Sequence, residues 1–147
     1  MYHPDSIYCK DNPNNKRMVE IFEEMRQPET TREQRIELAK EWTMMSLYRK
    51  EAYYEMLTRK MSGRTLVQKI DYFTSELHDY DVREQLKTSP VRAFIYCGRH
   101  DAQCPHVFSE EAARLMPNGT LETFEYSNHS PDIEKEEKFK TFIASTV

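Results

Sequence analysis

The sequence predicts an α/β fold in which helices come first and a strand–helix–strand unit follows. Apolar residues recur at helical spacing through most of residues 15–77. Residues 91–97 and 120–126 are short runs of apolar, β-branched and aromatic side chains, which is typical of strands. A helical pattern at residues 105–116 lies between them. Strands joined through a helix pair in parallel with a right-handed crossover, so we expect a βαβ unit here.

The first eighty residues are expected to be helical after an irregular start. Pro28 closes the first helix, a capping-box pattern at residues 31–34 opens the next, and the dipeptide Ser62-Gly63 interrupts the region. Helices are expected at residues 15–26, 31–48, 50–57 and 65–77, with a short turn of helix at 82–86. The inward-facing side chains should be Met18, Ile21, Phe22, Met25, Ile36, Leu38, Ala39, Trp42 and Met45.

In the later unit, each predicted strand runs into a polar loop. The first strand stops at Gly98, and Asp101 follows it. The second strand, anchored by Leu121 and Phe124, runs into a loop that contains His129. The intervening helix begins after Cys104-Pro105 and should present Val107, Phe108, Ala112, Leu115 and Met116 along one side.

Asp101 and His129 are the candidate functional pair. Both follow the carboxyl end of a strand, and open parallel sheets place their ligands at that edge. We therefore expect the two side chains to lie close together although they are 28 positions apart. Taken singly, each has a simpler interpretation, because an Asp can satisfy the amides of a turn and a His can be ordinary loop polarity.

The sequence of these loops resembles the last third of an α/β-hydrolase, and most of all that of the proline iminopeptidase-like branch. The matching segments are Gly-Arg-His-Asp at residues 98–101, Cys-Pro at 104–105, Met-Pro-Asn at 116–118 and Ser-Asn-His at 127–129. The resemblance implies that Asp101 is the triad acid and His129 the triad base. It also implies that residues 1–80 form a helical cap and residues 81–147 the C-terminal βαβα part of the hydrolase core.

The sequence departs from that family at the nucleophile. It contains no Gly-x-Ser-x-Gly elbow, and the one serine beside a glycine, Ser62, follows no predicted strand. We therefore expect a truncated member or fragment of a serine aminopeptidase or esterase, inactive alone, whose parent acts on small peptides or esters. The unpaired edge of the first strand would then favour self-association or docking on the missing N-terminal half.

Two other functions stay open. The chain could be a non-catalytic binding or oligomerisation module derived from a hydrolase. Alternatively, it could be a small thiol enzyme that uses Cys104 with His106 or His129, since a cysteine just before a helix N-terminus is favoured as the thiolate.

The helical region also holds candidates for substrate binding. The resemblance implies that carboxylates of the cap hold the free amino end of a substrate, and by location these are Glu41, Glu51 and Glu55. Trp42, Met45 and Tyr48 belong to a stretch rich in Met and aromatic residues that reads as a plastic apolar lining. The alternative for all of them is a small helical core with a solvated outer face.

Composition excludes several classes of partner. Net charge is −4, from 21 basic and 25 acidic residues, without a basic stripe, so nucleic acid is not an expected partner. No run is long and apolar enough for a membrane span, and no signal peptide is visible, so a cytoplasmic location is expected. The three cysteines (Cys9, Cys97, Cys104) predict no disulfide framework, and their spacing to His100 and His106 matches no zinc motif. We expect neither a metal nor a cofactor.

Overall fold

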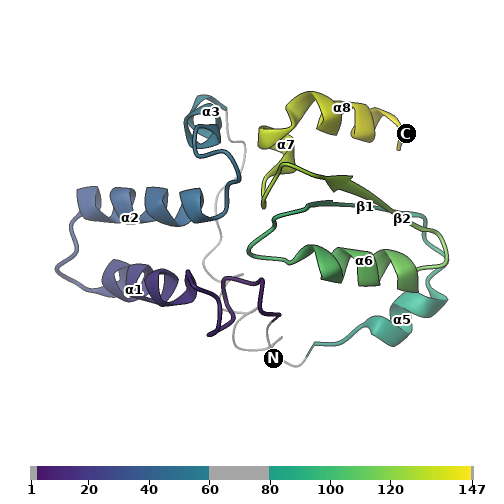
Figure 1. Ribbon diagram of the computed structural model, residues 1–147, viewed down its shortest axis with the longest axis horizontal. Helices are drawn as coiled ribbons and strands as arrows, with labels where there is room; N and C mark the ends of the chain where they lie inside the picture. The colour runs from purple at the N-terminus through teal and green to yellow at the C-terminus, as the bar shows by residue number, and fades with distance from the viewer. Residues whose placement is uncertain (1–2, 60–79, 147) are drawn as a thin grey trace.

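The structure is a computed structural model that describes residues 3–59 and 80–146. The described elements are α1 (Asn15–Arg26), α2 (Arg32–Met45), α3 (Ala52–Thr58), α5 (Arg83–Thr88), β1 (Ala93–Gly98), α6 (His106–Leu115), β2 (Gly119–Phe124), α7 (Pro131–Glu134) and α8 (Glu136–Ala144). Figure 1 shows α1 and α2 on one side of the molecule and the strands, with α6 and α8, on the other. The predicted helix at residues 65–77 and the break at Ser62-Gly63 lie outside the described residues.

The predicted parallel pairing of the two strands is confirmed. β1 and β2 are parallel, in a register that runs from Ala93 opposite Gly119 to Gly98 opposite Phe124. The strands lie between α6 on one face and α8 on the other (Figure 1). Both carboxyl ends therefore open at the same edge, toward the end of α2.

An aromatic cluster joins α8 to the sheet. Phe124 is fully buried, and its ring lies 6.1 Å from that of Phe139 and 6.4 Å from that of Phe142. Tyr96 of β1 packs edge-on against Phe139 at 5.0 Å. Burial of a side chain of this size contributes about 1.5–3 kcal/mol, so Phe124 is a main anchor of the sheet.

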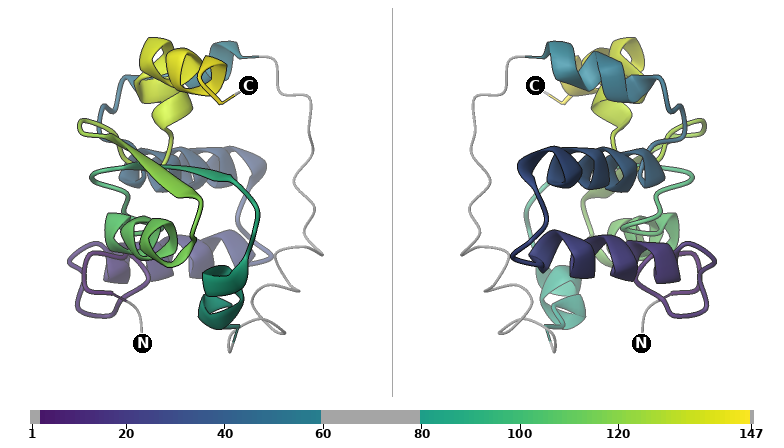
Figure 2. Two further views of the ribbon diagram at one scale, coloured as in Figure 1. Left: turned by 90° about the vertical axis from the view of Figure 1, so that its right-hand side faces the viewer. Right: turned by 90° about the vertical axis from the view of Figure 1, so that its left-hand side faces the viewer.

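The helical segment, α1 to α3, confirms the predicted start of α2 and corrects one of its faces. Thr31 Oγ1 accepts the N–H of Gln34, and the Gln34 side chain accepts the N–H of Thr31, which completes the capping box. α2 ends at Met45 rather than at residue 48. α2 packs beside α1 (Figure 2), and this turns Leu38 inward and leaves Ile36 51% exposed, so the expectation that Ile36 faces the core is wrong.

The apolar side of α6 is also narrower than predicted. Val107 and Phe108 are 41% and 47% exposed, so their placement along the buried side was wrong. His106 takes the buried position in the first turn instead, with its Nε2 2.8 Å from Oγ1 of Thr123 on β2. Within the residues that the structure describes, no helix has both the length and the apolar character to cross a bilayer.

Candidate active site

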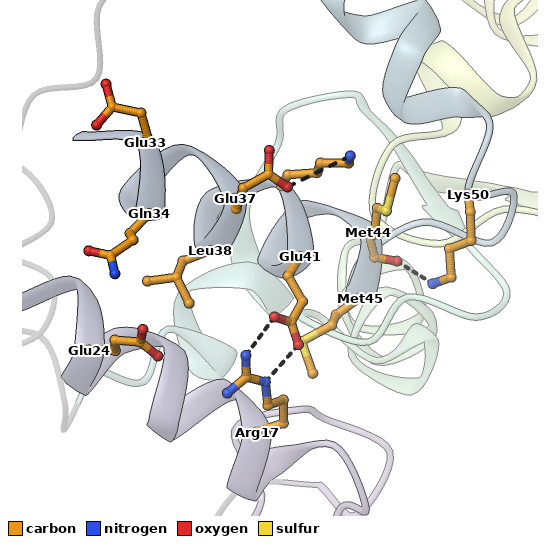
Figure 3. A pocket seen from close by; sticks show the side chains of 11 residues that line it. Arg17, Glu24, Glu33, Gln34, Glu37, Leu38, Glu41, Met44, Met45 and Lys50 are labelled. Atoms are coloured by element: carbon orange, nitrogen blue, oxygen red, sulfur yellow. Dashed lines mark hydrogen bonds and ion pairs between the residues drawn. The ribbon is translucent and has the colours of Figure 1, made fainter. Parts of the chain in front are cut away.

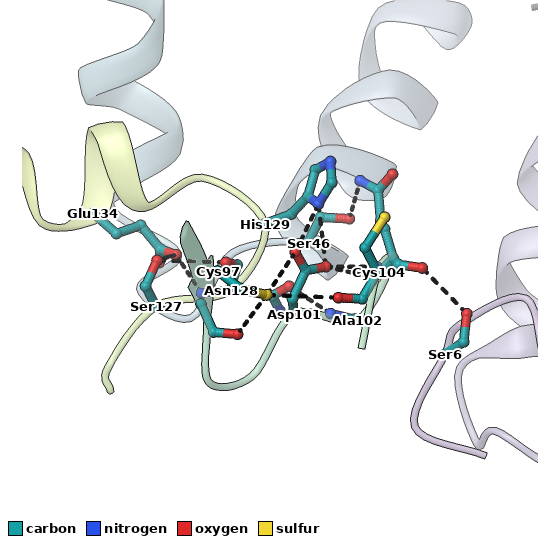
Figure 4. Close-up of polar contacts among 12 residues, drawn as sticks. Ser6, Ser46, Cys97, Asp101, Ala102, Cys104, Ser127, Asn128, His129 and Glu134 are labelled. Carbon is teal, nitrogen blue, oxygen red and sulfur yellow. Dashed lines mark hydrogen bonds and ion pairs between the residues drawn. The ribbon is translucent and has the colours of Figure 1, made fainter. Parts of the chain in front are cut away.

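Asp101 and His129 meet at the carboxyl edge of the sheet, as the topology predicts (Figure 4). His129 Nδ1 lies 3.0 Å from Asp101 Oδ2 and 3.1 Å from Oδ1. The Asp101 side chain is 7% exposed, whereas that of His129 is 39% exposed. A carboxylate accepts only, so Nδ1 carries the proton in this contact. A buried carboxylate thus holds one side of an imidazole whose other side reaches the surface.

The loop of residues 98–105, here the acid loop, is folded around the same carboxylate. Asp101 Oδ1 accepts the backbone N–H groups of Gln103, at 2.9 Å, and Cys104, at 2.8 Å. Asp101 therefore satisfies the amides of a turn, as its simpler interpretation predicts, in addition to its contact with His129. The turn bonds use Oδ1 alone, whereas the imidazole lies within hydrogen-bond distance of both oxygens, so the loop presents the carboxylate to His129.

Gly98 allows the acid loop to touch the loop of residues 125–130, here the base loop. A Cβ at Gly98 would stand 2.0 Å from the carbonyl oxygen of Asn128 and 2.5 Å from that of Ser127. His100 N–H donates to the Ser127 carbonyl at 3.0 Å, and Ala102 N–H donates to Asn128 Oδ1 at 2.8 Å. These contacts bring the acid and the base within bonding distance.

The end of α2 supports both loops through Ser46, which is 5% exposed. The Ser46 carbonyl accepts the His129 N–H at 3.1 Å, and Ser46 Oγ accepts Nε2 of Gln103 at 2.9 Å. Ser46, Asn128 and the buried Glu134 are residues of the site that the sequence did not predict. A helix C-cap serine and an asparagine before the histidine carry no pattern that distinguishes them from ordinary loop residues.

The electrostatics favour a protonatable imidazole. The hydrogen bond to Asp101 raises the pKa of His129 above its ordinary value of 6.5, against the opposing effect of burial. Nearby Asp132 adds a smaller effect in the same direction. Within the described part of the chain, Nε2 of His129 makes no hydrogen bond. His129 is therefore oriented by one nitrogen and free to exchange a proton through the other.

The thiols do not show the character expected of a nucleophile. Cys97 is 4% exposed, and burial raises the pKa of its thiol to about 11. The pKa of Cys104 is also raised, first by desolvation and then by the charge of Asp101. The expectation that a helix N-terminus lowers this pKa is wrong, because α6 begins only at His106 and the charge of Asp101 disfavours the thiolate. In residues 3–59 and 80–146, no group of three or more His, Cys, Asp or Glu side chains is arranged to hold a metal ion.

Two of the candidate substrate carboxylates are already paired with arginines. Figure 3 shows Glu41 and Arg17 facing each other between α2 and α1, with both Glu41 oxygens 2.6 Å from guanidinium nitrogens. The Arg17 hydrogen bonds lower the pKa of Glu41. Glu55 makes the same kind of two-point contact with Arg49, at 2.9 and 3.0 Å. Neither carboxylate is free for a substrate amino group in this arrangement.

The apolar candidates divide into two places. Trp42 packs against Phe22, with ring centroids 5.0 Å apart, and against Tyr8, so it belongs to the helical core. Met45 and Tyr48 instead border a hollow of about 850 Å³ that also reaches Asp101 and His100. The Tyr48 ring lies 4.8 Å from that of His100. The structure therefore brings Met45 and Tyr48 to the acid loop and keeps Trp42 away from it.

Two solved structures are similar to this chain. The chain superposes on an alpha/beta fold family hydrolase from Bacillus anthracis str. Sterne with a TM-score of 0.91 and 44% identity, covering 99% of this chain and 52% of that one. It also superposes on an esterase from Exiguobacterium antarcticum with a TM-score of 0.62 and 20% identity, covering 97% of this chain and 53% of the esterase. At that identity the second likeness shows the fold alone.

No protein-family model matches the sequence, and no curated protein is significantly similar to it. The chain spans about half the length of each of the two solved relatives. Its helices, followed by a parallel two-strand sheet, have the α/β-hydrolase fold over that half.

Proposed function

We propose that this chain supplies the acid and the base of a serine hydrolase that cleaves small peptides or esters. The observation that carries the proposal is the pairing of buried Asp101 with Nδ1 of His129 while Nε2 has no partner among the described residues. In this proposal residues 1–80 act as the cap over the site, and a cytoplasmic location is consistent with the three free cysteines.

The mechanism would follow the acid–base division of a Ser-His-Asp triad. Asp101 fixes the tautomer of His129 and stabilises the imidazolium that forms. His129 Nε2 then takes the proton from a serine hydroxyl as the hydroxyl attacks the carbonyl, and returns the proton to the leaving group. The raised pKa of His129 suits this alternation between base and acid near neutral pH.

The serine would come from outside these 147 residues, because the sequence contains no Gly-x-Ser-x-Gly motif. Two serines near the site are hydrogen-bonded to other groups. Ser46 Oγ accepts a bond from Gln103, and Ser127 Oγ donates to Glu134 at 3.0 Å. No described serine is hydrogen-bonded to the His129 ring.

Peptides and esters are both candidate substrates. The proline iminopeptidase-like wording of the two loops favours an aminopeptidase, which needs a free carboxylate for the substrate amino group. Glu41 and Glu55 are both paired with arginines, so for a peptide substrate this role falls to Glu51, which makes no ion pair among the described residues.

The test is complementation. The chain would be co-expressed with the part of the Bacillus anthracis hydrolase that it does not match, and p-nitrophenyl ester hydrolysis measured. We expect turnover from the pair and none from this chain alone. In the pair, Asp101→Asn should lower kcat by about 10⁴-fold, as the same change does in a serine protease, and His129→Ala by at least that much. Glu137→Gln, an exposed change on α8, is the control. Robust turnover by the chain alone, or a pair insensitive to His129→Ala, contradicts the proposal.

The alternative, a binding or oligomerisation module, is supported by the incomplete sheet. In the described residues β1 pairs only with β2, and Tyr96 and Val91 are 44% and 61% exposed. An open strand edge is a template for another strand, either from a second copy or from the nucleophile-bearing part. Light scattering over micromolar concentrations separates the cases, because a concentration-dependent dimer favours the module and a steady monomer counts against self-association.

A further inference from the structure

Glu134 is an acidic side chain buried at the end of α7, only 4% exposed. Its Oε2 accepts the hydroxyl of Ser127 at 3.0 Å and the backbone N–H of Asn128 at 2.7 Å. Its Oε1 accepts the backbone N–H of Arg49 at 2.7 Å. Burial of a carboxylate is costly unless hydrogen bonds compensate for it, and here three donors do so.

These three contacts join parts of the chain that are far apart in the sequence. Ser127 and Asn128 precede the histidine in the base loop, and Arg49 lies between α2 and α3, 85 positions before Glu134. Figure 4 shows the Glu134 carboxylate directed at Ser127 and Asn128, on the side of the loop away from Asp101. The next amide along, that of His129, is held by the Ser46 carbonyl. Of the consecutive amides at the imidazole, that of Asn128 is therefore fixed by Glu134 and that of His129 by the end of α2.

We propose that Glu134 is a positioning residue for His129. The Glu134 carboxylate ties the base loop to the α2–α3 connection, so that Nδ1 of His129 faces Asp101. The catalytic importance of this tie rests on the function proposed above, whereas the geometric effect does not. A displacement of the helical segment at Arg49 would therefore change the position of His129 through the Glu134 carboxylate.

The chemistry requires a carboxylate of this length. All three partners are donors, and an amide offers one acceptor oxygen and an NH₂ group that would face a donor. Glu134→Gln therefore loses at least one of the backbone bonds. Glu134→Asp keeps the charge but is one methylene short, so it cannot reach both the Arg49 amide and the base loop without distortion.

The experiment is an NMR titration of the full chain, labelled with ¹⁵N in its histidines. In the parent, the neutral His129 ring should carry its proton on Nδ1, with a downfield proton resonance from the bond to Asp101. In Glu134→Gln and Glu134→Asp, we expect that resonance to weaken or vanish and the tautomer to become mixed. The midpoint of the His129 titration should move toward the midpoint of the same titration in the Asp101→Asn variant. Glu137→Gln, exposed three positions further on, should leave all three signals unchanged.

Glu134→Asp separates positioning from simple charge, because it retains the negative charge beside the base loop and leaves Asp101 and Asp132, the charges that raise the pKa of His129, in place. A Glu134→Asp protein that folds and keeps the parent tautomer, resonance and midpoint would overturn the proposal. If Glu134→Gln does not fold, Glu134→Asp alone decides, with the same two outcomes. None of these signals requires hydrolysis, so a failed complementation assay leaves this result interpretable.

Discussion

Gly98 and Asn128 lie in backbone contact, so close that a Cβ on the glycine would stand 2.0 Å from the Asn128 carbonyl oxygen. The contact is where the acid loop and the base loop meet, and both are held there by further hydrogen bonds. The approach of the two loops, rather than any unusual backbone angle, is what requires glycine at this position, since no described glycine has a positive φ.

Gly98→Ala should therefore destabilise the chain and separate Asp101 from His129. Backbone atoms must move to admit the methyl group, and overpacking of this kind costs about 1–3 kcal/mol or more. Urea unfolding followed by circular dichroism measures the loss. Gly119→Ala is the matched comparison, because its nearest contacts are at 2.9 Å and the strain is smaller. Equal stability of Gly98→Ala and the parent would show that the loops are not held together as described.

The stability of the chain should depend on pH through His129. Its pKa is raised on folding, so the bond to Asp101 contributes fully below the ordinary value of about 6.5. That contribution is lost as pH rises from there through the higher folded pKa. The free energy of unfolding should thus fall over this interval in the parent. The fall should be shallower in Asp101→Asn, which keeps an Oδ1 acceptor for the loop amides, and in His129→Asn. Identical slopes of unfolding free energy against pH in all three proteins would show that the Asp101–His129 pair does not cause the pH dependence.

Cys104 should react slowly with a maleimide near neutral pH, more slowly than free cysteine. Its thiol pKa is raised by desolvation and by Asp101, so little thiolate is present. Cys97, buried and with a pKa of about 11, should react more slowly still. Mass spectrometry of the labelled chain identifies each site, and labelling in urea gives the unprotected rate. Rapid labelling of Cys104 by one equivalent of maleimide would instead support the alternative that the chain is a thiol enzyme.

Thr31→Ala should cost about 1 kcal/mol of stability through loss of the α2 cap, which is the usual effect of removing such a residue. The hydroxyl accepts the Gln34 amide at 3.2 Å, and the Gln34 side chain returns a 2.8 Å bond. Thr31→Ser keeps the acceptor and should unfold near the parent's urea midpoint. An alanine variant as stable as the serine variant would mean that the box contributes nothing.

The sequence predicted the described elements from α1 to β2 and the meeting of Asp101 with His129, because both follow from local pattern and from the rules of parallel strand connection. It failed where tertiary packing decides. Ile36 and Leu38 both belong to plausible apolar stripes of α2, and only the position of α1 selects Leu38. The capping box, in contrast, is local and was predicted correctly.

Glu134 escaped prediction for a different reason. A glutamate followed by Lys and two further glutamates reads as solvated surface, and its burial depends on donors from Arg49 and Asn128, which no local pattern connects to it. Among apolar residues, Val107 and Phe108 show the reverse error. Their pattern favours burial, but the described strands cover only part of α6.

The short span between Asp101 and His129 has a consequence for how such a site can arise. Acid and base come from one continuous strand–helix–strand segment, 28 positions apart, and the hydrogen bond between them lies within that segment. The entropic cost of closing a loop of this size is moderate, because that cost grows only slowly with loop length. A gene rearrangement that moved this segment as a unit would carry a ready imidazole–carboxylate couple with it, whatever scaffold later provided the atom to be deprotonated.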